Sequence, residues 1–91
     1  MKIANGFVLK KINGVNTVIA LGNATKTLNG MLVLNETATF LWENLQNGLN
    51  KQQLIDMLLQ NYEVTNEQAE KNVSEFIKKL SDLKIIETNE K

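Results

Sequence analysis

The side chains that could do chemistry in this sequence are carboxylates and lysines, because it contains no cysteine and no histidine. Without histidine the usual general base and the commonest metal ligand are missing, and without cysteine there is no thiol nucleophile or disulfide. Glu36 and Glu43 could be mistaken for an acid/base pair, but seven residues of helix separate them by about 10 Å along the axis. No third catalytic group accompanies them. We therefore expect surface carboxylates and a protein that is not an enzyme, with no cofactor and no metal.

Length and charge narrow the class of protein further. A chain of 91 residues is long enough for one small domain, and we expect residues 1–91 to form that single domain. The formal net charge is zero and all ten basic residues are lysines, which argues against nucleic acid as a partner. The apolar runs are too short to cross a membrane, and the N-terminus lacks the apolar core of a signal peptide. We expect a cytoplasmic protein.

The segment from Gly30 to Trp42 turns from strand to helix without a loop. The four apolar residues 31–34 are followed directly by Asn35. The side chain of Asn35 can cap the free N–H groups at the start of a following helix. Glu36 then places a negative charge at the positive end of the helix dipole. The pattern predicts a short strand and a helix over 36–47, with Gly48 as a left-handed cap and a buried face of Ala38, Leu41, Trp42 and Leu45.

Two β-rich runs, 7–12 and 15–21, flank Asn13-Gly14. This dipeptide favours a type I′ turn, in which both central residues have positive φ, and so predicts a hairpin. The turn would pair Ile12 with Val15, Val8 with Ile19, Phe7 with Ala20 and Leu9 with Val18. Residues 22–30 are polar and predict a loop.

Two further helices are predicted from caps and periodicity. Asn50 with Gln53 forms a capping-box pattern before a helix that ends near Tyr62, with an apolar stripe of Leu54, Ile55, Leu58 and Leu59. A second capping-box pattern, Thr65 with Gln68, precedes a long helix over 66–83. Its expected buried face is Ala69, Val73, Phe76, Ile77, Leu80 and Leu83, and its expected outer ion pairs are Glu67–Lys71 and Glu75–Lys79. Ile85 and Ile86 are expected to pack on the core before a charged, frayed end.

The order of elements is three strands and then three helices. It predicts an α+β fold in which a small three-stranded antiparallel sheet packs against a three-helix unit. Two short helices and a long third one are typical of a winged helix-turn-helix arrangement.

The chain from about Phe7 to Glu87 resembles the PqqD family, also called RiPP precursor peptide recognition elements. The resemblance rests on the Leu-Asn-Glu-Thr-Ala core around Asn35 and on residues after it in the same order, namely Trp42, Leu45, Gly48, Leu54, Tyr62, Val64, Val73, Phe76, Ile77, Leu80, Ile85 and Ile86. The sequence departs from the family pattern at three places. Asn72 stands where aspartate is common, Lys84 stands where glycine is common, and the loop over 22–30 is long.

What the resemblance implies is a non-catalytic domain that binds the leader segment of a ribosomally made precursor peptide. In the family the leader adds a strand to the third strand and lies in a groove beside the third helix, as in β-augmentation. The implied edge is 31–34, which carries no lysine, proline or bulge signal to block pairing. The residues expected to bind peptide are Met31, Leu32, Val33, Leu34, Ala69, Asn72, Val73, Phe76, Lys79 and Leu80.

The expected partners are a precursor leader and a peptide-modifying enzyme such as a radical SAM protein, a cyclase or a leader peptidase. The protein would be a monomer or a weak homodimer, since an open strand edge can self-pair. Two other interpretations remain. One is a winged-helix DNA-binding regulator, which the neutral charge disfavours, and the other is an accessory subunit that docks on a larger enzyme.

Overall fold

The N-terminal part of the chain forms the predicted hairpin. In this computed structural model, which describes residues 2–28 and 30–87, β2 (Phe7–Ile12) and β3 (Val15–Ala20) pair antiparallel. The predicted register is confirmed at every pair, including Phe7 with Ala20 and Ile12 with Val15. Asn13 and Gly14 have φ of 52° and 79°, as a type I′ turn requires. The turn chemistry therefore fixes the register of the sheet.

The predicted polar loop over 22–30 is wrong in part. Residues Gly22–Lys26 form a short 3-10 helix, η1, and Ala24 and Leu28 are each only 8% exposed. The helix packs closely against Gly6, where an added Cβ would lie 2.8 Å from the Ala24 Cβ. The segment thus closes one end of the core, which its isolated apolar residues did not reveal.

The strand-to-helix junction is as predicted. Strand β4 (Met31–Val33) pairs with β3, and α1 (Glu36–Leu45) follows at once. The side chain of Asn35 accepts a hydrogen bond of 2.8 Å from the backbone N–H of Ala38. Helix α1 ends two residues before its predicted end, and Gly48 follows with φ of 82°.

Helices α2 (Lys51–Asn61) and α3 (Asn66–Asp82) complete the three-helix unit. The capping box at Asn50 is confirmed. At α3 only half of the predicted box forms, because Thr65 accepts from the Gln68 N–H while the Gln68 side chain donates to Asn72 instead.

The charges on α3 also pair differently from the prediction. Within the described ranges, the ion pair on this helix joins Lys78 to Asp82 at 3.1 Å, and neither Glu67–Lys71 nor Glu75–Lys79 is within ion-pair distance. All of these side chains sit on a solvated helix face, where such pairs contribute little to stability.

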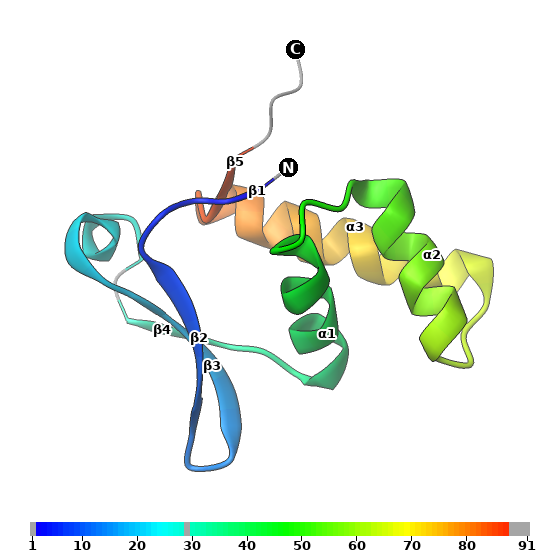
Figure 1. The fold of residues 1–91 in the computed structure, drawn as a ribbon, viewed down its shortest axis with the longest axis horizontal. Coiled ribbons are helices and arrows are strands. Elements are labelled where there is room, and N and C mark those ends of the chain that lie inside the picture. Colours follow the sequence, from blue (N-terminus) through cyan, green and yellow to red (C-terminus); the bar gives the residue numbers. More distant parts are fainter. Residues whose placement is uncertain (1, 29, 88–91) are drawn as a thin grey trace.

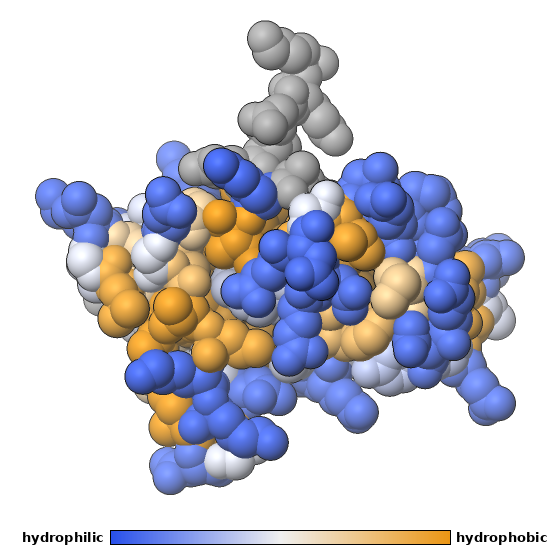
Figure 2. Space-filling model, viewed as in Figure 1, coloured by the Kyte–Doolittle hydropathy of each residue, from blue (hydrophilic) through white to orange (hydrophobic). Residues whose placement is uncertain are grey.

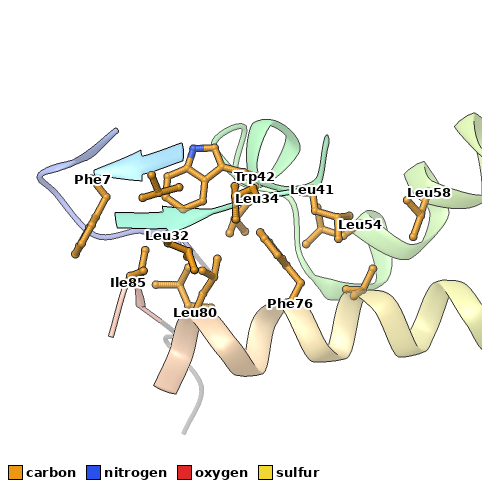
Figure 3. Packing of buried hydrophobic residues seen from close by; sticks show 14 of the residues in the cluster. Phe7, Leu32, Leu34, Leu41, Trp42, Leu54, Leu58, Phe76, Leu80 and Ile85 are labelled. Atoms are coloured by element: carbon orange, nitrogen blue, oxygen red, sulfur yellow. The ribbon is translucent and has the colours of Figure 1, made fainter. Parts of the chain in front are cut away.

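The sheet lies on one side of the molecule and the helices lie on the other, with the core between them (Figure 1). Trp42 and Leu45 are fully buried at its centre, as the sequence predicts. On α3 the predicted buried face holds, except that Ile77 and Leu83 are only partly buried. The core side chains of the sheet and of α1 and α3 meet in Figure 3, and the largest fully buried ones are Trp42, Leu41, Leu45, Leu54, Leu58, Leu80, Ile85, Val18 and Val73.

The two ends of the described chain meet in a second, two-stranded sheet that the sequence did not predict. Strand β1 (Lys2–Ile3) pairs antiparallel with β5 (Ile86–Glu87). Ile85 and Ile86 are 0% and 6% exposed, so the prediction that they pack on the core is confirmed. The predicted frayed end lies outside the described residues. The part of the chain that the structure describes has no helix long and apolar enough to span a membrane.

Candidate functional site

Strand β4 has a neighbour on one side only. The strand order in the larger sheet is β2-β3-β4, so β4 presents an edge. The backbone N–H of Leu34 donates to the Asn16 carbonyl at 2.9 Å. Because the hydrogen-bonding direction alternates along an antiparallel strand, Leu32 also points its backbone groups at β3. The N–H and C=O groups of Met31 and Val33 therefore point to the open side of the strand.

The side chains of β4 alternate between the core and solvent. Leu32 and Leu34 are 8% and 6% exposed, whereas Met31 and Val33 are 66% and 60% exposed. The strand is thus anchored by two leucines, and its open edge is held in an extended form. Figure 3 shows Leu32 and Leu34 on the side of β4 from which Phe76 and Leu80 approach out of α3.

A cavity of about 270 Å³ opens beside this edge, between β4, the first turns of α1 and the middle of α3. Its apolar side chains come from all three elements and its polar ones stand at α1 and α3. The lining residues are Leu32, Val33, Leu34, Asn35, Thr37, Ala38, Leu41, Asn72, Glu75, Phe76, Lys79 and Leu80.

The wall that α3 contributes follows from helical spacing. Asn72, Glu75, Phe76, Lys79 and Leu80 lie three or four residues apart, and such positions share one helix face. Phe76 and Leu80 are 8% and 1% exposed and form the apolar part. Asn72, Glu75 and Lys79 supply an amide and both signs of charge. The arrangement suits an extended peptide, whose side chains alternate between an apolar pocket and a polar rim.

The side chain of Asn72 is held in place from within α3. Gln68 donates from its Nε2 to the Asn72 Oδ1 at 2.8 Å. The amide at this position is therefore oriented before any ligand arrives. Asparagine also offers both a donor and an acceptor, where the aspartate common in the family offers only acceptors.

The structure brings most of the expected peptide-binding residues together at this cavity. Those that line it are Leu32, Val33, Leu34, Asn72, Phe76, Lys79 and Leu80. Met31 lies at the start of the same edge. Ala69 and Val73 do not line the cavity: both are 0% exposed and belong to the hydrophobic core. Their expected role in contacting a peptide is thus corrected to a role in packing.

The cavity walls from α1 and from Glu75 were not predicted from the sequence. Thr37, Ala38 and Leu41 line the cavity, since the start of α1 follows β4 directly and closes one end of the groove. The helical spacing of Glu75 from Asn72 and Lys79 was a usable signal, but Glu75 was assigned to an outer ion pair.

Other candidate residues carry no site. Glu36 and Glu43 are exposed on α1, and Trp42 is a core residue at 0% exposure. Among the described residues there is no group of three or more acidic side chains that could hold a metal ion. A second cavity, of about 380 Å³, lies between residues 2–7 and the end of α1.

The fold and the site together define a small α+β protein with an open strand edge beside an apolar groove. Residues 18–86 match the family described as "Coenzyme PQQ synthesis protein D (PqqD)". The chain therefore belongs to the PqqD family, which confirms the resemblance seen in the sequence.

Two solved structures share the fold. One, "TbiB1 in Complex with the TbiA(beta) Leader Peptide", has 19% sequence identity and a TM-score of 0.79, with 100% of each chain covered. The other, "Lasso peptide synthetase B1 complexed with the leader peptide", has 17% identity and a TM-score of 0.72, with 89% of each chain covered. No curated protein matches the sequence significantly. At these identities the likeness concerns the fold, and the predicted α+β architecture is confirmed.

Proposed function

We propose that this protein binds the leader segment of a ribosomally synthesised precursor peptide by adding it as a strand to β4, and presents it to a peptide-modifying enzyme. The observation that carries the proposal is the open edge of β4 beside the cavity between β4, α1 and α3. Membership of the PqqD family supports it. So do the two structural neighbours, whose descriptions state that a leader peptide is bound.

The register of β4 sets how such a peptide would sit. Met31 and Val33 each offer one N–H and one C=O on the open side, and these would pair with the backbone of the peptide. Each such hydrogen bond adds about 0.5–1.5 kcal/mol net. Peptide residues opposite Leu32 and Leu34 would point into the cavity, because directly opposite residues share a face of the sheet. Two apolar side chains spaced i and i+2 would therefore fill it.

The side chains at the cavity would add specificity to this backbone pairing. Phe76 and Leu80 would contact the apolar residues of the leader, while Lys79 and Asn72 would contact its polar groups. Since these four residues lie on one rigid helix, they would read a fixed spacing along the peptide. The protein itself would carry no catalytic step, and the chemistry would belong to the enzyme it serves.

A winged-helix DNA-binding regulator is the weaker candidate. Its recognition helix would be α3, which carries three lysines (Lys71, Lys78, Lys79) and four acids (Glu67, Glu70, Glu75, Asp82). A helix with more acids than bases is poorly suited to a groove lined by phosphates.

The test is the affinity for the leader half of a precursor peptide encoded beside the gene, measured for Val33→Pro and Val33→Ala. Both variants replace the branched valine side chain, but only proline removes the N–H on the open side. Proline is tolerated where a strand N–H faces solvent. We expect Val33→Pro to weaken binding by at least about fivefold relative to Val33→Ala, the loss of one hydrogen bond. Equal affinities for the two variants would contradict strand addition at β4.

A further inference from the structure

The face of the larger sheet that points away from the helices is apolar. From the strand register, the side chains on this outer face are the aliphatic residues Val8, Ile12, Val15, Ile19, Met31 and Val33, together with Lys10 and Thr17. The four most exposed of the aliphatic residues range from 38% for Ile12 to 66% for Met31. Figure 2 shows hydrophobic surface over this part of the molecule, around β4 and the hairpin.

This face departs from the pattern of a sheet that faces water. An antiparallel sheet with one solvated side normally alternates apolar residues inward with polar residues outward. Here the inward positions are apolar apart from Lys11 and Asn16, with Val18 at 0% exposure, and most outward positions are aliphatic as well. Contiguous apolar surface of this kind marks an interaction site.

Charged residues are distributed unevenly between residues 1–35 and the rest of the chain, and this distribution indicates the charge that a partner should carry. Residues 1–35 contain four lysines and no acid, so the remaining residues contain six lysines and all ten acids. Lys10 stands on the outer face, across from Thr17. A second copy packed by a two-fold axis would bring two lysine-bearing faces together, which is unfavourable. A partner with carboxylates around an apolar patch is complementary.

The position of the face relative to β4 points to the same partner. A strand added to β4 would place alternate side chains beside Met31 and Val33 on the outer face. A protein docked there would contact both the sheet and the bound peptide. An anionic membrane fits less well, since attraction to such surfaces depends on clusters of about 4–8 basic residues and this face carries one.

We propose that the outer face of the β2-β3-β4 sheet is the docking surface for the enzyme that acts on the bound peptide, through an apolar patch on that enzyme edged by acidic residues. This inference rests on the proposed function. It assigns the two sides of the sheet to two partners: the peptide at the edge and the groove, the enzyme on the outer face.

The experiment measures two affinities for each variant: that for the leader peptide, and that for the purified modifying enzyme encoded beside the gene, with and without leader. The double variant Ile12→Thr/Val15→Thr removes apolar surface from the hairpin end, remote from the groove, and keeps the β-branched shape that strands favour. We expect its enzyme affinity to fall at least about tenfold, as for a hot-spot residue, with leader affinity within about twofold of wild type.

A matched pair of lysines tests the charge. Lys10→Glu reverses a charge on the outer face, and Lys11→Glu does so one residue along, on the opposite side of β2. We expect the first to weaken enzyme binding at least about fivefold and the second by less than about twofold, by electrostatic complementarity. Wild-type enzyme affinity in the double variant, or equal losses for the two lysines, would overturn the docking surface.

Two further results would also overturn it. These are saturable binding of the outer face to vesicles of anionic phosphatidylglycerol, and a wild-type dimer in sedimentation that the double variant abolishes. If wild type binds the enzyme without leader but binds no leader, the proposed function fails while the docking surface stands.

Discussion

The C-terminus of α3 holds a lysine in a backbone conformation that suits glycine. Lys84 has φ of 61°. Its N–H donates to the Ser81 carbonyl at 2.9 Å, and the N–H of Ile85 donates to the Leu80 carbonyl at 2.8 Å. These two bonds form the Schellman motif, in which the residue after the helix is left-handed. The motif also sets Leu80, one wall of the cavity, beside the buried Ile85.

Replacing Lys84 by glycine should therefore stabilise the protein. A non-glycine residue in the left-handed region costs about 1–2 kcal/mol, and glycine recovers this at an entropic cost of about 0.5–1 kcal/mol. In the described part of the chain the Lys84 side chain is exposed and makes no ion pair, so little else is lost. We expect a gain of about 0.5–1 kcal/mol in the free energy of unfolding, or about 2–8 °C in Tm for a chain of this size.

Urea unfolding followed by circular dichroism measures the change, with Lys71→Gly as the matched control. Lys71 is exposed within α3, where glycine costs about 1 kcal/mol. The same chemical substitution should thus stabilise at one position and destabilise at the other. A Lys84→Gly protein that is no more stable than wild type would refute the assignment of strain to this residue.

Two other substitutions test the helix cap and the cavity. Asn50→Ala should lower the free energy of unfolding by about 1 kcal/mol, whereas Asn50→Gly should cost only a few tenths; equal losses in urea unfolding would argue against the side-chain cap. Ala38→Leu adds apolar volume to the wall of the cavity, so we expect leader affinity to fall at least about tenfold while Tm holds or rises. Unchanged affinity in fluorescence anisotropy would show that the leader binds elsewhere.

The hairpin shows what local chemistry can predict. Asn13-Gly14 fixes a two-residue turn, and a two-residue turn fixes every pair between β2 and β3. The helix starts at Asn35, Asn50 and Thr65 were also predictable, because each cap satisfies N–H groups within three residues of itself.

The missed elements depend on tertiary contacts. The helix η1 exists because Ala24 finds room beside Gly6 and Leu28 is buried in the core, and nothing in a polar segment with two separated apolar residues indicates this. Strands β1 and β5 have two residues each, too few for a periodic pattern. They pair only because the core brings the two ends of the chain together.

The candidate site was predicted in part, and mainly through the family resemblance. Leu32, Val33 and Leu34 line one cavity together with Asn72, Phe76, Lys79 and Leu80 from α3, while Met31 does not line it. Helical periodicity placed Ala69 and Val73 on the buried face of α3, as the structure has them, whereas the family resemblance also listed them as peptide-binding residues, although they do not line the cavity. The wall from α1 was missed because it depends on how closely its first turn approaches β4.

The most direct test of leader binding at β4 is an NMR titration of the labelled protein with the leader half of a precursor peptide encoded beside its gene. Strand addition at β4 predicts saturable shifts concentrated at Met31–Val33 and at the residues of α3 that line the cavity, with little change at the hairpin tip. Saturable shifts with duplex DNA and none with any leader, or leader shifts centred on the second cavity at residues 2–7, would contradict it.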